Sequence, residues 1–95
     1  MLKFCANISW LFREVPFLER PAAARRAGFA GIEFHTTEGH TAAQIVQAAS
    51  DAGMSIVLFN ARPGDFLEGG PGLSGVPGRE AEFRRAVQQA CEFGV

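Results

Sequence analysis

Polar residues stand at the ends of three short apolar segments of this 95-residue chain, and their types could do chemistry. Asn7 and Asn60 close two of these segments, while Glu33 and His35 lie within and at the end of the other. In folds where parallel strands alternate with helices, chemistry gathers at the carboxyl ends of the strands. An amide or imidazole there can donate to a bound hydroxyl or carboxylate. The alternative is a structural hydrogen bond to a neighbouring loop, because a buried amide needs a partner.

Glu33 and the two histidines of the chain need separate interpretations. Glu33 lies between Ile32 and Phe34, so its side chain faces opposite to theirs. A carboxylate buried among apolar neighbours must be paired, which leaves a binding role and a structural network both open. His35 and His40 are five positions apart with a turn between them, which is not the spacing of two metal ligands on one helix face. We expect an exposed His40 and keep His35 as a candidate.

A long loop rich in glycine and proline, at about residues 61–77, follows the third apolar segment. Loops of this length are usually functional or disordered. Asp65 and Arg79 bracket it, and either could reach a carboxylate substrate or pair with the other. Residues 70–75 match G-x-G-x-x-G, but they neither follow a strand directly nor open a helix, so a dinucleotide site is not predicted. We interpret the loop as a flexible segment over the mouth of the sheet's carboxyl end, and a lid that closes over a substrate is a sharper alternative.

Strand-like and helix-like segments alternate along the chain. The predicted strands cover about 3–8, 31–35 and 54–60, and the predicted helices cover about 15–27, 42–51 and 78–93. Thr41 and Gln44 have the spacing of a capping box, whereas Pro21 means that the first helix either bends or starts later. Pro16 suits the first turn of that helix.

These units predict one parallel α/β sheet with helices on one side, because crossovers between parallel strands are almost always right-handed. Residues 56–59 are all apolar and are expected to alternate between the two faces of the sheet. The face away from the helices then has no cover. We therefore expect the chain to be part of a larger fold, or a piece completed by another chain.

Composition and charge exclude several classes of protein. The formal net charge is −1, which gives no electrostatic footprint for nucleic acid. The longest apolar runs are far shorter than the roughly 20 residues of a membrane span, and the N-terminus lacks the layout of a signal peptide. A cytoplasmic protein without nucleic-acid or membrane partners is expected. Cys5 and Cys91 are interpreted as small buried hydrophobic residues rather than a disulfide pair.

Motifs spread along the chain resemble the hydroxypyruvate isomerase family. Residues 4–12 read F-C-A-N-I-S-W-L-F, similar to the family's F-x-A-N-L-S-x-L-F, and residues 27–34 contain its A-G-F followed by I-E-F. Residues 58–65 read L-F-N-A-R-P-G-D, close to L-F-N-x-P-P-G-D. Residues 72–83 resemble G-L-x-x-x-P-G-R-x-x-x-F. The chain departs from the family at residues 35–39, at Arg62 and at Pro21, and the first departure leaves substrate choice open.

The resemblance implies a xylose-isomerase-like TIM barrel, of which residues 1–95 would be the first three βα units of (β/α)8, with parallel strands, outer helices and an end before strand four. A full barrel takes about 250 residues. The implied reaction interconverts hydroxypyruvate and tartronate semialdehyde, or a related 2-oxo acid, through an enediol. Two glutamates and a divalent Mg or Mn ion would serve it. The resemblance places these glutamates and the metal ligands beyond Val95, so no catalytic or metal residue is assigned here.

As substrate-binding candidates we keep Asn7, Glu33, His35, Asn60, Asp65 and Arg79. The expected partner is a small 2-oxo acid, and a homo-oligomer is left open. One alternative is a non-catalytic half-barrel that folds by assembling with itself or with another chain. Another is an apurinic-site endonuclease, which shares the fold. The net charge of −1, and Asn60 rather than a histidine closing the third strand, argue against the endonuclease.

Overall fold

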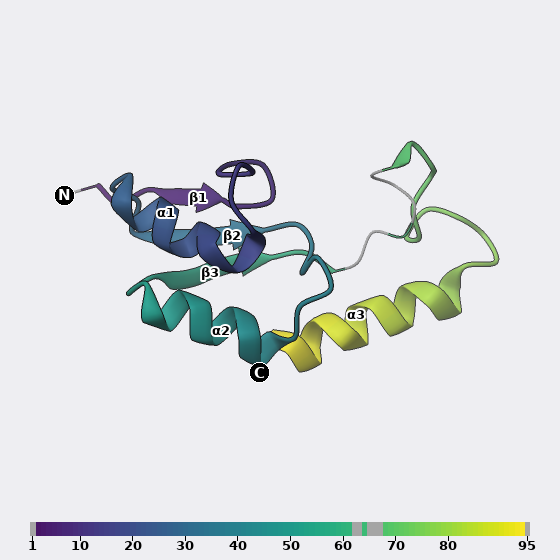
Figure 1. The fold of residues 1–95 in the computed structure, drawn as a ribbon. Coiled ribbons are helices and arrows are strands. Elements are labelled where there is room, and N and C mark those ends of the chain that lie inside the picture. The colour runs from purple at the N-terminus through teal and green to yellow at the C-terminus, as the bar shows by residue number, and fades with distance from the viewer. Residues whose placement is uncertain (1, 62–63, 65–67, 95) are drawn as a thin grey trace. The chain divides into compact units, whose positions relative to one another are not determined.

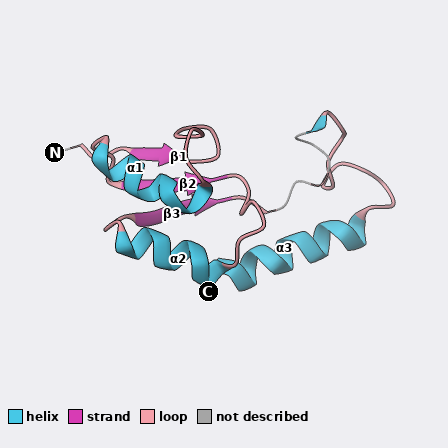
Figure 2. Ribbon diagram, in the orientation of Figure 1, coloured by secondary structure: helices cyan, strands magenta, loops and turns pink. Residues whose placement is uncertain are grey.

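The computed structural model describes residues 2–61, 64 and 68–94, which form three parallel strands and three α-helices (Figures 1 and 2). In chain order the elements are β1 (Cys5–Asn7), a 3-10 turn (Phe17–Glu19), α1 (Arg20–Arg26), β2 (Gly31–Phe34), α2 (Ala42–Asp51), β3 (Ser55–Phe59) and α3 (Glu80–Gly94). The chain divides into two compact units, residues 1–59 and residues 60–95. Each unit is described by itself.

The first unit is one parallel sheet with two helices on the same face. The strand order is β1-β2-β3, and both neighbouring pairs are parallel. Helix α1 contacts β2, α2 contacts β3, and the two helices contact each other (Figure 1). The prediction of consecutive βα units with helices on one side is confirmed for these two helices.

The core of this unit lies between the sheet and the two helices. Ala6, Ile32 and Phe34 from the strands and Ile8, directly after β1, are buried there, together with Ile45 and Ala49 of α2 and Ala24 of α1. The Phe34 ring meets Phe17 edge-on, with ring centroids 5.9 Å apart, and stacks on Phe59 at 5.8 Å. Aromatic pairs at these separations add to area burial, so the three rings join β2, β3 and the 3-10 turn.

Strand β3 does not alternate as the sequence suggested. Ile32 pairs with Ile56 and Glu33 pairs with Leu58, so Val57 is an extra residue in a β-bulge. A bulge lets two successive residues oppose a single partner residue. Phe59 consequently shares the helix-covered face with Ile56, while Val57 (63% exposed) and Leu58 (50% exposed) are left uncovered.

The proline of the first predicted helix decides where that helix begins. Helix α1 starts at Arg20, with Pro21 in its first turn, where the missing N–H costs nothing. Of the two alternatives for Pro21, the later start is the one observed. Pro16 lies outside any helix at φ −57° and ψ 152°, directly before the 3-10 turn, so its predicted place in the first helical turn is wrong.

Helix α2 has the predicted bounds and the predicted capping box. The Thr41 side chain accepts from the backbone N–H of Gln44, and the Gln44 side chain accepts from the backbone N–H of Thr41. Gly53 follows the helix at φ +68°, a conformation that favours glycine. The strands are a few residues shorter at their ends than predicted.

The second unit contains α3, whose first turn carries Glu80 and Glu82 as predicted. The two cysteines are both exposed, so their interpretation as buried hydrophobic residues is wrong. Cys5 lies on the sheet face that α1 and α2 leave uncovered. Over the part of the chain that the structure describes, no helix has the length and apolar character needed to cross a membrane.

Candidate active site

Asn7 and Glu33 meet on the uncovered face of the sheet, at the carboxyl ends of β1 and β2. The two residues are register partners in neighbouring strands, and both alternate with buried residues that point toward the helices. The Asn7 amide Nδ2 donates to Glu33 Oε1 over 3.4 Å. Both side chains are only part-buried. This pair therefore offers an amide and a carboxylate to a molecule bound at the carboxyl end of the sheet.

The Asn7 amide is oriented by the turn that follows β1. Its Oδ1 accepts from the backbone N–H of Ser9 at 3.0 Å, which is the local turn that asparagine side chains favour. Because Oδ1 is occupied by this donor, Nδ2 is the atom that faces Glu33. The orientation of the amide therefore follows from two independent hydrogen bonds.

Ser9 extends the network to the end of β2. Its hydroxyl Oγ accepts from the backbone N–H of His35 at 2.8 Å. The ring of Trp10 meets the His35 ring edge-on, with centroids 5.7 Å apart, and Trp10 remains 55% exposed. Asn7, Glu33 and His35 are therefore brought into one connected group, which we call the strand-end network together with Ser9 and Trp10.

A buried arginine is hydrogen-bonded to the loops that follow β1 and β2. Arg20 is 7% exposed, and its guanidinium donates to the carbonyls of Ile8 and Val15 and to the carboxylate of Glu38. Sequence reasoning missed Arg20 and Glu38 as well as Ser9 and Trp10. The one signal available was the Asn7-x-Ser9 spacing, which is typical of an asparagine turn.

Glu33 also affects the neighbouring thiol. Although Cys5 is exposed, neighbouring atoms partly desolvate its thiol, and this desolvation and, second, the negative charge of Glu33 raise its pKa. Both causes disfavour the thiolate, which is the nucleophilic form. Cys5 is therefore a neutral neighbour of the network at physiological pH rather than a nucleophile in it.

Two of the remaining sequence candidates, Asn60 and Arg79, belong to the second unit. Asn60 follows β3 directly and is exposed, but it belongs to the second unit. Asp65 lies outside the described residues. Arg79 donates from Nη1 to the Gly72 carbonyl at 3.1 Å and lies 3.6 Å from a carboxylate oxygen of Glu82.

His40 differs from its predicted role. It is part-buried, and its ring stacks on Phe17 with centroids 5.5 Å apart. The expectation of a plainly exposed histidine is therefore wrong. The aromatic partner at residue 17 could not be paired with residue 40 from the sequence, because the two are brought together only by the packing of the 3-10 turn.

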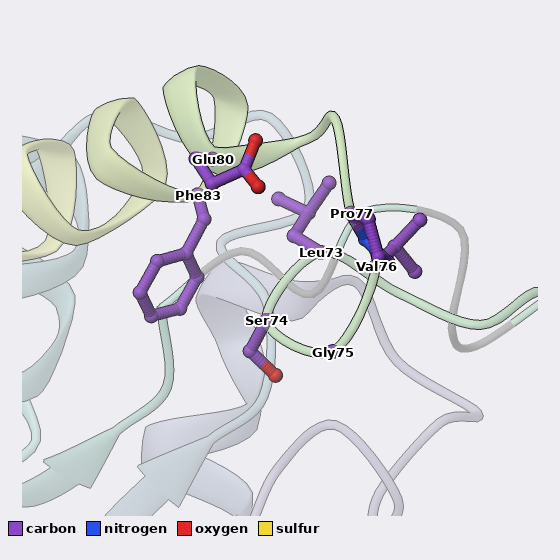
Figure 3. A pocket seen from close by; sticks show the side chains of 7 residues that line it. All are labelled: Leu73, Ser74, Gly75, Val76, Pro77, Glu80 and Phe83. Atoms are coloured by element: carbon purple, nitrogen blue, oxygen red, sulfur yellow. The ribbon is translucent and has the colours of Figure 1, made fainter.

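A shallow hollow of about 280 Å³ lies within the second unit (Figure 3). The loop residues Leu73–Pro77 form one side of it, and Glu80 and Phe83 of α3 form the other. Hydrogen bonds from its own backbone N–H and from that of Gly78 hold the pKa of Glu80 below its usual range. The hollow therefore has both polar and apolar walls and carries the negative charge of Glu80, so it is unsuited to an anionic ligand.

The divalent metal implied by the family resemblance does not fit the described residues. No three His, Cys, Asp or Glu side chains come close enough together to hold a metal ion over residues 2–61, 64 and 68–94. Glu33, the carboxylate of the strand-end network, accepts a hydrogen bond from the Asn7 amide. No chemical step is therefore derived through a metal on these residues.

Comparisons with curated sequences and with solved structures both find longer proteins that match nearly the whole of this chain. The chain is 42% identical over 98% of its length to a 2-oxo-tetronate isomerase from Cupriavidus necator and 36% identical over 98% to the hydroxypyruvate isomerase of Escherichia coli. It spans 36% of the length of each. Among solved structures, that of an AP endonuclease, family 2, from Brucella melitensis superposes with a TM-score of 0.87 at 42% identity, over 98% of this chain and 36% of that one.

No protein-family model matches the chain. The two kinds of comparison place the 95 residues at the beginning of a larger fold, of which they span about a third. The three parallel strands and their helices match the first part of a xylose-isomerase-like TIM barrel. The chain corresponds to the N-terminal portion of the hydroxypyruvate isomerase and 2-oxo-tetronate isomerase family.

Proposed function

We propose that these residues form the substrate-binding strands of an isomerase that interconverts hydroxypyruvate and tartronate semialdehyde, or a related 2-oxo acid. The observation that carries this proposal is the strand-end network, which joins the Asn7 amide, the Glu33 carboxylate and the backbone N–H of His35 at the carboxyl ends of β1 and β2. Active sites of TIM barrels lie at that end of the strands. The isomerase names of the relatives support the choice of reaction.

In this proposal the strand-end network binds and orients the substrate rather than carrying out the proton transfer. The Asn7 amide and the His35 ring offer donors and acceptors to the hydroxyl, carbonyl or carboxylate oxygens of a 2-oxo acid. Glu33 can accept a hydrogen bond from a substrate hydroxyl. The two glutamates that would move the proton, and the ligands of a Mg or Mn ion, are assigned to the remainder of the barrel on the family resemblance.

The test is a fusion protein in which these 95 residues replace the matching third of the Cupriavidus necator relative. We expect the fusion protein to isomerise hydroxypyruvate or a 2-oxo-tetronate in the presence of Mg²⁺ or Mn²⁺. The 95-residue chain by itself should show no turnover. A correctly folded fusion protein without turnover of either substrate would contradict the proposal, and so would metal-dependent turnover by the isolated chain.

Asn60 receives its own test because it belongs to the second unit, whereas the strand-end network belongs to the first. We expect Asn60→Ala in the fusion protein to lower turnover by about 3 kcal/mol of transition-state stabilisation, if the amide holds a developing oxyanion. A structural amide would instead cost about 1–3 kcal/mol of folding stability. Melting temperature and turnover measured on the same variant separate these roles, and near-normal turnover would remove Asn60 from the site.

One observation supports a second candidate, a non-catalytic half-barrel that assembles with itself or with another chain. The uncovered sheet face exposes apolar side chains at Val57 and Leu58. Exposed apolar patches favour association. Sizing chromatography of the 95-residue chain should then show an oligomer or a complex rather than a monomer. A discrete oligomer together with an inactive fusion protein would favour this candidate over the isomerase.

The endonuclease name of the Brucella melitensis protein defines a control. Incubating the fusion protein with duplex DNA that contains an abasic site should give no cleavage, because these 95 residues, with a net charge of −1, add no attraction for phosphates. The cytoplasmic location expected from the sequence is part of the same proposal. Microscopy of the tagged protein in its own cell tests it.

A further inference from the structure

Arg20 is the buried charged residue of the described chain, and all of its contacts join loops at the carboxyl end of the sheet. Its Nη1 donates to the Ile8 carbonyl at 2.9 Å and to Glu38 Oε2 at 3.0 Å, while its Nε donates to the Val15 carbonyl at 3.1 Å. Its guanidinium carbon also lies 5.5 Å from the centre of the Phe17 ring. A planar guanidinium can hold several acceptors in fixed directions, which an ammonium cannot do.

The hydrogen bond to Ile8 holds the backbone between Asn7 and Ser9, two residues of the strand-end network. Ile8 is fully buried, and its own N–H donates to the Glu33 carbonyl at 2.9 Å. The Ile8 peptide is therefore held by β2 through its N–H and by Arg20 through its carbonyl. Asn7 and Ser9 flank this residue, so their directions depend on how Ile8 is held.

The bond to Glu38 acts on the other loop of the network. Glu38 lies three residues after His35, in the loop between β2 and α2, and has a left-handed backbone at φ +49°. Such a backbone is unfavourable outside glycine and persists only where other contacts hold it. The ion pair with Arg20 is such a contact. Arg20 thus bonds both the loop that carries Ser9 and the loop that follows His35.

We infer that Arg20 is a positioning residue, which sets the directions of Asn7, Ser9 and His35 by fixing the Ile8 carbonyl and Glu38. This inference rests on the proposed function, since it assumes that the network contacts substrate. Arg20 itself is buried and bonded to protein acceptors, so it acts through the backbone and not on the substrate.

The inference is tested by amide hydrogen exchange and kinetics on the fusion protein. The Ser9 and His35 amides donate to the two side-chain acceptors of the network, so their exchange rates report on it directly. The variants are Arg20→Lys, which keeps the positive charge but removes the planar guanidinium, and Glu38→Gln, which keeps a hydrogen-bond acceptor but removes the negative charge. Arg26→Lys, at an exposed position in the last turn of α1, is the matched control.

We expect Arg20→Lys to speed exchange at the Ser9 and His35 amides about tenfold, which corresponds to the loss of one charge-assisted hydrogen bond. The α2 amides should be unchanged. Since misplacement by about 1 Å can cost roughly a hundredfold in rate, kcat/KM should fall by up to that factor well below the melting temperature. Glu38→Gln should have a smaller effect of the same kind, and Arg26→Lys should have none.

The inference is overturned if Arg20→Lys leaves both amides within about twofold of the parent, since that is well under the effect of one such bond. It is also overturned if exchange accelerates uniformly through β1–β3 and both helices, because Arg20 would then be a general stabiliser of the fold. Unchanged kcat/KM despite altered exchange would equally contradict a positioning role. An inactive parent fusion protein would contradict the proposed function alone, since the exchange data would still decide whether Arg20 orders the network.

Discussion

The Asn7–Glu33 pair can be tested by giving it a second negative charge. Asn7→Asp keeps the size of the side chain and keeps an oxygen to accept from the Ser9 N–H, but it removes the amide that donates to Glu33. In the parent the donor and acceptor atoms are 3.4 Å apart. In the variant two carboxylate oxygens would meet at that distance without a proton between them.

The magnitude follows from the distance. Two unit charges at this separation repel by about 1 kcal/mol in bulk water and by about 5 kcal/mol at the effective dielectric constant of a protein surface. Both side chains are part-buried, so the free energy of unfolding should fall by an amount between these limits. The lost amide hydrogen bond contributes about another 1 kcal/mol.

The effect must depend on pH in a defined direction. The charge of Glu33 holds the pKa of the introduced carboxyl above the value of about 3.9 that it has in the unfolded chain. A carboxyl whose pKa is higher in the folded than in the unfolded chain destabilises the fold least when the pH is below its unfolded-state pKa. The loss of stability then grows as the pH rises through the folded-state pKa. The melting temperatures of variant and parent should therefore differ least near pH 4 and diverge as the pH rises.

The assay is thermal unfolding of the fusion protein and its variant from pH 4 to 8, at low and high salt. Asn7→Asp combined with Glu33→Gln is the control, since it exchanges donor and acceptor and should restore most of the lost stability at pH 8. A difference in melting temperature that is constant across this pH range would refute the reasoning. It would mean that the two side chains do not face each other.

Three further outcomes follow from individual contacts. Glu33→Gln should speed alkylation of Cys5 near pH 8.5 in the 95-residue chain, because one of the two causes that raise the pKa of this thiol is removed; an unchanged rate would leave burial as the only cause. In urea unfolding, Gly31→Ala should destabilise the fusion protein by about 1–3 kcal/mol, because the new methyl would lie 2.8 Å from Val57 Cγ2. Adding Val57→Ala should recover part of this loss. Thr41→Ala should cost about 1 kcal/mol in the same assay, and no loss would show that the capping box is dispensable.

The elements that local signals specify were predictable. The bounds of α2 follow from a capping box at one end and a glycine at the other, and both are observed. The parallel sheet follows from the alternation of strands and helices. The β-bulge was not predictable, because the apolar residues at 56–59 fit either face of a strand and carry no signal for an extra residue.

The candidate site was predicted in part. Asn7, Glu33 and His35 were selected from their places at strand ends, and the structure joins them. The residues that join them were missed, because Ser9 acts through a backbone turn and Arg20 reaches its acceptors only after the 3-10 turn and α1 have packed. From the sequence, an arginine near the start of a helix is expected to be exposed to solvent, and only the folded structure shows that it is buried.

The bulge in β3 has an evolutionary consequence. Without Val57, residues 56, 58 and 59 would alternate as an ordinary strand, with Ile56 and Phe59 still on the helix-covered face. A deletion at this position should therefore be accepted by the core. It would also remove the side chain that now closes the space beside Gly31. Among descendants of this sequence, we expect the loss of a residue in β3 to occur together with the gain of a side chain at position 31.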